Sequence, residues 1–212
     1  MSNLLIQPGA RVLFQGDSIT DAGRSRENDQ MLGHGYVNLI AAWLSARYPG
    51  RRIEFLNRGV SGNRVYDLEA RWESDCVALR PDWLSILIGI NDTWRNFDRG
   101  IPSPVPEFEA CYRRLLDRVK SETTARLILL EPFVLPVPPD RVAWRADLDP
   151  RIAAVRRVAA DYGALYVPLD GLFAAAAAQR EASFWAADGV HPSTAGHALI
   201  AQAWIRTVEE GL

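Results

Sequence analysis

The sequence has little of several residue types, and each scarcity excludes a class of protein. Its 212 residues include only two cysteines, Cys76 and Cys111, which lie in helix-like stretches without metal-ligand spacing. Neither a disulfide framework nor a zinc site is therefore indicated. The formal net charge of only −2 is mixed along the chain rather than gathered into blocks. We therefore expect no nucleic-acid partner and no membrane partner, and a small neutral or polar ligand instead.

Long apolar runs are also missing. No run approaches the ~20 residues that are needed to cross a bilayer, and the first ten residues, MSNLLIQPGA, lack the basic and apolar segments of a secretory signal. Both absences predict a cytoplasmic protein. The length and a hydrophobic content of 48% fit one α/β domain that buries roughly 70% of its unfolded surface.

Short β-rich runs alternate with longer stretches of helical periodicity. The runs that predict strands are 12–15, 53–57, 83–88, 127–130 and 164–168. The stretches that predict helices are 35–47, 64–78, 106–121, 150–162, 171–180 and 194–209, the last of them capped by Ser193. The proline-rich segments 99–106 and 132–149 are expected to be loops over the strand ends. This alternation predicts a single-domain, three-layer α/β/α sandwich around a five-stranded parallel sheet of order 2-1-3-4-5.

Chemically active residue types follow the first three predicted strands. Gly16, Asp17 and Ser18 follow the first strand, the segment NRGVSGN at 57–63 follows the second, and GIND at 89–92 follows the third. Ligands of parallel sheets bind outside the carboxyl ends of the strands where the strand order reverses, and the order 2-1-3 puts the second and third loops on either side of Ser18. A serine at this place is also a common helix cap, so Ser18 is a nucleophile only if other groups gather around it.

Groups that could serve such a nucleophile are present. The backbone N–H groups of Ser18 and Gly62 and the side-chain amide of Asn91 could stabilise the negative charge that arises when a serine attacks an ester. By itself, a glycine at position 62 is explained equally well as a turn residue with no catalytic role. The base must be held in place by a third group, and His191 lies three residues after Asp188, close enough to share one turn. By themselves, Asp188 and His191 are explained equally well as residues of an ordinary loop.

Four blocks, GDSIT, GVSGN, GIND and DGVHP, occur in this order and together resemble the motifs of the SGNH hydrolases, also called GDSL-like esterases and lipases. The resemblance extends from residue 12 to the final helix, and it implies one SGNH hydrolase domain over residues 1–212 with the flavodoxin-like fold of that superfamily. It implies a catalytic triad of Ser18, Asp188 and His191 and an oxyanion hole formed by Ser18, Gly62 and Asn91. Neither a cofactor nor a metal is implied.

Longer stretches are similar to the intracellular acetyl xylan esterases of this superfamily. The stretches are GDSITD, NRGVSGNRVYDLEARW, PDW, IGINDTWR and VHPSTAGH. The similarity implies a serine esterase that forms an acyl-enzyme and removes short acyl groups, above all acetyl groups from xylo-oligosaccharides or related sugars. It also implies a homo-oligomer. The two proline-rich segments depart from this pattern, and loops of this kind shape specificity, so the substrate is the least determined feature.

Six further residues near these motifs are candidates for substrate binding: Asp17, Tyr36, Arg58, Asn63, Trp94 and Trp185. Most of them have an ordinary structural alternative. Asp17 can hold the strand-to-helix turn, and Arg58 can form an ion pair at the surface. The aromatic rings can pack in the core as readily as they can stack on a sugar.

Three other functions stay open on the sequence alone. An SGNH hydrolase of the lysophospholipase or thioesterase type would act on longer acyl chains. A metal-dependent phosphoesterase would use oxygen and nitrogen ligands, and the available set is Asp17, Asp21, Asn91, Asp92, Asp188 and His191. A non-catalytic flavodoxin-like module would bind a phosphate after the first strand, although the acids in GDSITDAG would repel that anion.

Overall fold

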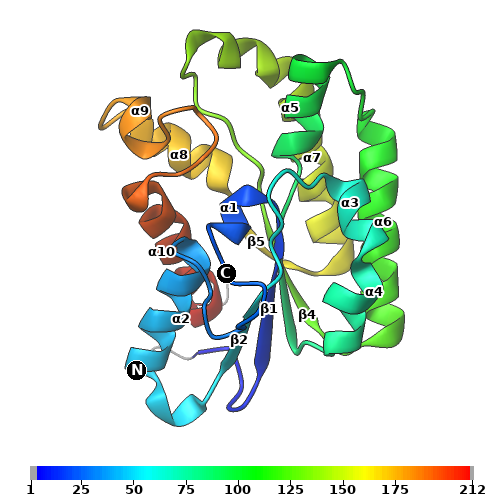
Figure 1. The fold of residues 1–212 in the computed structure, drawn as a ribbon, viewed down its shortest axis with the longest axis vertical. Helices are drawn as coiled ribbons and strands as arrows, with labels where there is room; N and C mark the ends of the chain where they lie inside the picture. The colour runs from blue at the N-terminus through cyan, green and yellow to red at the C-terminus, as the bar shows by residue number, and fades with distance from the viewer. Residues whose placement is uncertain (1–3, 211–212) are drawn as a thin grey trace.

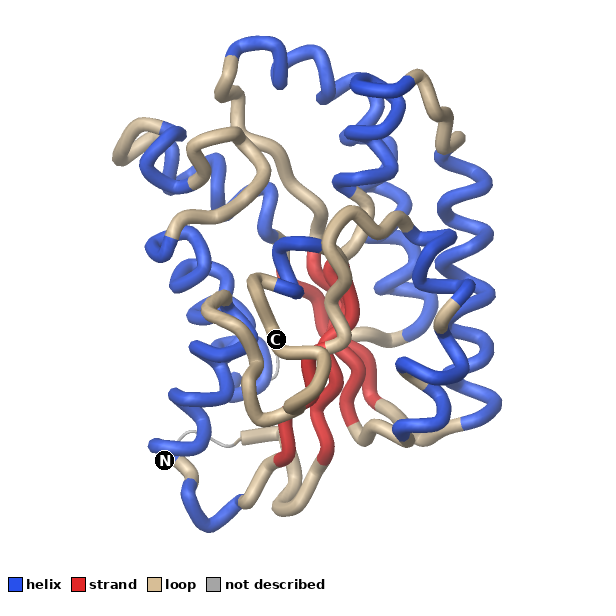
Figure 2. The backbone as a smooth tube through the Cα atoms, in the orientation of Figure 1, coloured by secondary structure: helices blue, strands red, loops and turns tan. Residues whose placement is uncertain are grey.

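The computed structural model describes residues 4–210 and contains a five-stranded parallel sheet of order β2-β1-β3-β4-β5. The strands are β1 Arg11–Gly16, β2 Glu54–Asn57, β3 Trp83–Leu87, β4 Arg126–Leu130 and β5 Leu165–Val167. Each lies within one residue of its predicted range at either end. The strand order that the sequence predicts is therefore confirmed. Figure 2 shows the α/β class, with strands at the centre and helices around them.

Helices lie on both sides of the sheet, which gives the three expected layers (Figure 1). One side carries α2 Tyr36–Arg47, α8 Leu169–Ala177, α9 Ala182–Trp185 and α10 Thr194–Glu210. The other side carries α3 Val65–Ala70, α4 Trp72–Asp75, α5 Ile90–Arg99, α6 Val105–Glu122 and α7 Arg145–Tyr162. The short α1 Ser18–Asp21 stands at the end of β1, and the 3-10 helices are η1 Pro49–Arg51, η2 Val77–Leu79 and η3 Pro139–Trp144.

Burial on both faces explains why the central runs form strands. Every residue of β3 is buried, as expected for a parallel strand that helices cover on either side. On one face, the rings of Tyr36 and Trp204 pack against Phe14, with ring centres 5.9 and 5.4 Å away. On the other face, the indole N–H of buried Trp72 donates to the carbonyl oxygen of Leu115 at 3.0 Å. Because β1 pairs in parallel with β2 and with β3, the carboxyl ends of all three strands lie at the same end of the sheet.

Some expected helices and loops differ from the observed ones. The stretch 64–78 is divided into α3, α4 and η2, because Arg71 leaves the helical conformation between the first two, with φ −116° and ψ 12°. The segment 132–149 is a loop only as far as Pro138, since η3 leads directly into α7, which accommodates Pro150. The segment 99–106 shortens to the loop 100–104. The sequence pattern does not predict α5, because its residues are mostly polar and only its first four are buried.

The last helix begins where the sequence predicts. The hydroxyl of Ser193 accepts a hydrogen bond from the N–H of Gly196 at 3.2 Å, which is the bond of a helix cap. This cap fixes the end of the loop that contains residues 188–191 relative to α10. None of the helices within residues 4–210 combines the length and the apolarity that a membrane span needs.

Candidate active site

The turn after β1 shows that Ser18 is not the cap of the helix that follows. Asp17 is the N-cap of α1, and its Oδ1 accepts a hydrogen bond from the N–H of Ile19 at 3.0 Å. Ser18 is the first residue of the helix. Because Asp17 already satisfies the cap, the hydroxyl of Ser18 is free to interact with another group.

That group is His191, which lies 173 residues further along the chain. The Oγ of Ser18 is 2.8 Å from Nε2 of His191, and Nδ1 of the same ring is 2.6 Å from Oδ2 of Asp188. The other oxygen of Asp188 accepts from the backbone N–H groups of Val190 at 3.0 Å and His191 at 2.8 Å. These bonds hold the carboxylate, and the carboxylate holds the ring with Nε2 facing the hydroxyl. A ring that donates from Nδ1 can accept a proton at Nε2.

The charges of this pair follow from the same contacts. Burial opposes ionisation of Asp188, but the hydrogen bonds from the His191 ring and from the two backbone N–H groups outweigh it, so the pKa of Asp188 is lowered. The hydrogen bond to Asp188 raises the pKa of His191 above its ordinary value, against a smaller effect of burial. Asp188 is therefore ionised at neutral pH and stabilises positive charge on the ring.

Three possible hydrogen-bond donors come from the segments that follow β1, β2 and β3. Asn91 is in the first turn of α5, and its Nδ2 donates to the carbonyl oxygen of Asn63 at 3.1 Å, next to Gly62. Gly62 has φ +83°, a conformation that favours glycine. The Ser18 N–H belongs to the first turn of α1, where backbone N–H groups have no partner within the helix. The loop of Gly62 continues the pairing with β1, since the N–H of Val60 donates to the carbonyl oxygen of Gly16 at 3.1 Å.

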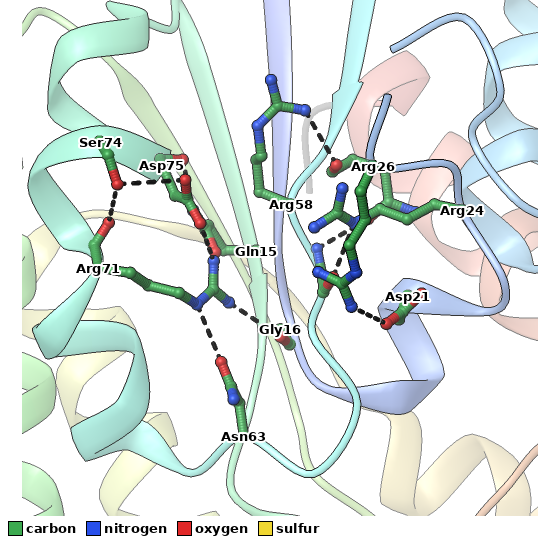
Figure 3. Close-up of polar contacts among 12 residues, drawn as sticks. Gln15, Gly16, Asp21, Arg24, Arg26, Arg58, Asn63, Arg71, Ser74 and Asp75 are labelled. Carbon is green, nitrogen blue, oxygen red and sulfur yellow. Dashed lines mark hydrogen bonds and ion pairs between the residues drawn. The ribbon is translucent and has the colours of Figure 1, made fainter. Parts of the chain in front are cut away.

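Arginines hold this loop from two sides (Figure 3). On one side, Nε of Arg71 donates to Oδ1 of Asn63 at 2.9 Å, and Nη2 donates to the carbonyl oxygen of Gly16 at 3.4 Å. On the other side, Nε of Arg24 donates to the carbonyl oxygen of Gly59 at 2.8 Å. The backbone of residues 59–63 is thus fixed relative to the end of β1, just before Ser18.

The family model of the GDSL-like lipases and acylhydrolases matches residues 14–199, which is most of the chain. The chain belongs to the GDSL-like lipase/acylhydrolase family.

Individual relatives extend this result. The acetylxylan esterase of Geobacillus stearothermophilus is 37% identical over 211 residues, which cover 96% of this chain and 95% of that protein. The crystal structure of Axe2, an acetylxylan esterase from the same organism, has a TM-score of 0.89 at 37% identity and covers 97% of this chain and 96% of its own. A Parabacteroides merdae protein described as a GDSL-like lipase has a TM-score of 0.93 at 35% identity, with 97% and 98% covered. Our GDSL-like protein is thus a carboxylic ester hydrolase.

The relatives also include structures of two catalytic mutants of Axe2. In one a serine is replaced by alanine, and in the other an aspartate is replaced by alanine.

Two of the candidate substrate-binding residues of this GDSL-like hydrolase do not reach the surface. Asp17 is fully buried, and burial raises its pKa to about 7, while its Oδ2 has no hydrogen-bond partner among the described residues. Tyr36 is also fully buried, with its hydroxyl 3.0 Å from Oγ1 of Thr20. Their assignment to substrate binding is corrected, because both side chains are enclosed by the protein itself: Asp17 forms the cap and Tyr36 forms part of the core.

The other four candidates are partly buried. The ring centre of Trp94 is 5.7 Å from that of His191. Asn63 is engaged by Arg71, as described above. Both Nη atoms of Arg58 donate to the carboxylate of Asp29, at 2.6 and 2.9 Å, which is the ion pair considered from the sequence. The indole N–H of Trp185 donates to the carbonyl oxygen of Ala176 at 3.1 Å. Of these four, Trp94 is the one in ring contact with His191.

A buried polar network beneath the start of α5 has no counterpart in the sequence analysis. Arg151 on α7 is fully buried, and its Nη2 donates to the carbonyl oxygen of Ser103 at 2.9 Å and to Oδ1 of Asp147 at 3.0 Å. The hydroxyl of Ser103 donates to Asp92 at 3.0 Å, and burial raises the pKa of Asp92 to about 6. The network supports the residue that follows Asn91. Its members are up to 59 residues apart, so only the fold brings them together.

The rim of the site also contains residues that the sequence does not single out. Nε of Arg141 donates to the carbonyl oxygen of Asp188 at 3.3 Å, and its guanidinium lies over the rings of Trp94 and Trp144, 5.2 and 4.0 Å from their centres. Arg95 follows Asn91 by one helical turn in the stretch IGINDTWR. Recognition of α5 as a helix would have been the signal that places Asn91 and Arg95 on one face.

The residues that the sequence offers as metal ligands do not form a metal site among residues 4–210. Within residues 4–210, no three His, Cys, Asp or Glu side chains are placed to hold a metal ion together. Asp188 and His191 are instead bonded to each other and to Ser18.

Proposed function

We propose that the protein is a serine esterase that hydrolyses short-chain acyl esters through an acyl-enzyme, with acetylated xylo-oligosaccharides or related sugars as its substrates. The observation that carries the proposal is the chain of contacts from the Ser18 hydroxyl to the His191 ring and the Asp188 carboxylate, at 2.8 and 2.6 Å. A serine hydroxyl is a weak nucleophile until a base in this position takes its proton.

The reaction follows from that geometry. Nε2 of His191 takes the Ser18 proton while Oγ attacks the ester carbonyl, and ionised Asp188 stabilises the imidazolium that forms. The N–H groups of Ser18 and Gly62 and the amide of Asn91 are the donors for the resulting oxyanion. When the tetrahedral intermediate collapses, the alcohol leaves with the proton from His191. Water then attacks the acyl-Ser18 ester with the same ring as base, and the acid is released.

Two observations support acetylated sugars as substrates. The acetylxylan esterase of G. stearothermophilus matches the chain over nearly its whole length. In addition, the indole of Trp94 lies beside the His191 ring, where the departing alcohol must be. An indole offers a flat apolar surface on which the ring of a sugar can stack.

A substrate panel on the purified protein tests the proposal. It includes acetylated xylose and xylo-oligosaccharides, p-nitrophenyl acetate, butyrate and octanoate, a lysophospholipid and an acyl-thioester. We expect the acetyl esters to be hydrolysed with the highest kcat/KM, and Ser18→Ala to abolish turnover while it retains ligand binding. A strong preference for octanoate or for the lysophospholipid would overturn the sugar assignment in favour of the long-chain alternative. Full activity in Ser18→Ala would overturn the mechanism.

Inhibitors separate the esterase from the metal-dependent alternative. Activity on p-nitrophenyl acetate should survive a chelator and be lost after treatment with a serine-directed organophosphate. The opposite pattern would support a metal-dependent phosphoesterase.

A further inference from the structure

Arg95 lies across the loop that contains Gly62. If residue 62 had a Cβ, that atom would be 3.9 Å from Nη2 of Arg95, and no other heavy atom of a non-neighbouring residue would be within 4 Å. Arg95 and Asn91 are four residues apart on α5, so they share one face of the helix. Nη2 of Arg95 therefore lies near Gly62, a candidate oxyanion donor.

This guanidinium is held in place but is not saturated with hydrogen bonds. Nη1 of Arg95 forms an ion pair with Oδ2 of Asp98 at 2.5 Å, and its Cζ is 5.8 Å from the ring centre of Trp94. Within residues 4–210, Nε and Nη2 of Arg95 have no hydrogen-bond partner, and the side chain is 21% exposed. Since Asp98 already balances its charge, the free donors suit a neutral hydroxyl better than a second carboxylate.

Trp94 connects Arg95 to the base. Its ring centre is 5.7 Å from that of His191 and 5.8 Å from Cζ of Arg95. A continuous wall from the loop of residues 57–63 to the base is therefore formed by Gly62, Arg95, Trp94 and His191. The alcohol of the ester must lie along this wall, because it leaves with the proton from Nε2 of His191. A flat apolar ring beside a free N–H donor matches an alcohol that has both an apolar face and hydroxyl groups.

We propose that Arg95 is a specificity-determining residue for the alcohol part of the ester, and that its guanidinium donates a hydrogen bond to a hydroxyl on the carbon next to the ester-bearing carbon. The acetyl group offers only a methyl group beyond its carbonyl, so it has no acceptor for these donors. The inference rests on the proposed function, since it takes Ser18 and His191 as the groups that cleave the ester.

A matched pair of esters isolates this contact. 2-Hydroxyethyl acetate and propyl acetate have the same acyl group and alcohols of nearly the same size, but only the first has a hydroxyl at the required carbon. We expect the wild type to hydrolyse the hydroxylated ester with the higher kcat/KM. Loss of a hydrogen bond from a charged donor should lower kcat/KM of Arg95→Ala for that ester by about 10- to 100-fold, mainly through KM, and leave propyl acetate nearly unchanged.

Two variants serve as controls. Arg99→Ala removes the same charge from the same helix at a side chain that is 63% exposed, and it should keep the preference for the hydroxylated ester. Arg95→Lys retains the charge and a donor but loses the planar fork, so it should restore part of the preference.

Each other outcome overturns the inference. Equal losses on both esters in Arg95→Ala would mean that Arg95 acts on the shared ester chemistry rather than on the alcohol. An unchanged preference would mean that Arg95 does not contact the hydroxyl. A wild type that hydrolyses both esters equally, in a manner that depends on Ser18, would refute the role of Arg95 and leave the esterase proposal standing. A wild type that hydrolyses neither ester would overturn the proposed function and this inference with it.

Discussion

Gly59 is the position in the loop of residues 57–63 where one methyl group should disturb the candidate oxyanion donors most strongly. A Cβ at residue 59 would lie 2.3 Å from the backbone nitrogen of Asp21 and 2.7 Å from the carbonyl carbon of Thr20, both in α1. Ordinary contacts begin near 3.4 Å, so the loop or the helix must move by about 1 Å. Neither can move freely, because Arg24 holds the Gly59 carbonyl oxygen.

This displacement should appear in catalysis. Gly62 lies three residues after Gly59 in the same loop, and Ser18 begins the helix on the other side of the contact. A shift of about 1 Å in a catalytic group costs about 10²-fold in rate. We therefore expect Gly59→Ala to lower kcat on p-nitrophenyl acetate by about 10²-fold and to lower the free energy of unfolding by about 1–3 kcal/mol, the usual cost of overpacking.

The assay compares this variant with Gly50→Ala. A Cβ at Gly50, in η1 before β2, would have no heavy atom within 4 Å, so this variant should keep the activity and stability of the wild type. Steady-state kinetics and urea unfolding followed by circular dichroism measure both quantities. A folded Gly59→Ala variant with wild-type kcat would refute the reasoning that the contact between this loop and α1 sets the geometry of the site.

Three further predictions concern charge. His191 accepts a proton only when its ring is neutral, so its raised pKa should put the midpoint of the acidic limb of the kcat/KM profile above pH 6.5. Asp188→Asn removes the main cause of that raised pKa, so it should move the midpoint to lower pH and reduce kcat by about 10³–10⁴-fold. Burial raises the pKa of Asp17 from 3.8 to about 7, so between these pH values the folded protein retains a proton that the unfolded chain releases. The free energy of unfolding measured in urea should therefore fall as pH rises between these values. Asp17→Asn should weaken this pH dependence. Arg151→Met should lower the free energy of unfolding by about 3–5 kcal/mol, because it leaves buried Asp92 without its nearby positive charge and Asp147 without its ion-pair partner. Arg157→Met, at a side chain 55% exposed, should cost less than about 1 kcal/mol in urea unfolding.

Contrary results are equally specific. An acidic limb at or below pH 6.5 would contradict the hydrogen bond to Asp188 as the cause of the raised pKa. A pH dependence of stability that Asp17→Asn leaves unchanged would mean that other groups produce it. Equal destabilisation by the two arginine variants would contradict the burial of the network.

The sheet could be predicted from the sequence because its signal is local. Runs such as WLSIL at 83–87 are short, apolar and buried throughout, and a stretch of helical periodicity occurs between each such run and the next. Parallel strands with short right-handed crossovers leave few possible orders. The helix α5 could not be predicted in this way, since its sequence INDTWRNFDR is polar and buries only its first turn. The break in the stretch 64–78 also depends on tertiary contacts, because Arg71 turns toward Asn63.

The candidate triad could be proposed from the sequence because GDSIT follows a strand and DGVHP stands just before the last helix, in the block order of the SGNH hydrolases. The separate roles of Asp17 and Ser18 required the structure, since both residue types cap helices, and here Asp17 is the one that does. Arg151 gave no signal in the sequence, because its partner Ser103 is 48 residues away and only the fold brings the two together. Arg95 gave none because the polar sequence of α5 does not predict a helix. Tyr36 and Trp94 looked alike in the sequence, yet one lies in the core and the other beside the His191 ring.

Peptide mass spectrometry after treatment with a serine-directed organophosphate tests most directly whether the Ser18 hydroxyl is the nucleophile. We expect one adduct, on the peptide that contains Ser18, and we expect its formation to parallel the loss of esterase activity. The Ser18→Ala and His191→Ala proteins should not form it. An adduct on another residue, or full activity in protein modified at Ser18, would contradict the account.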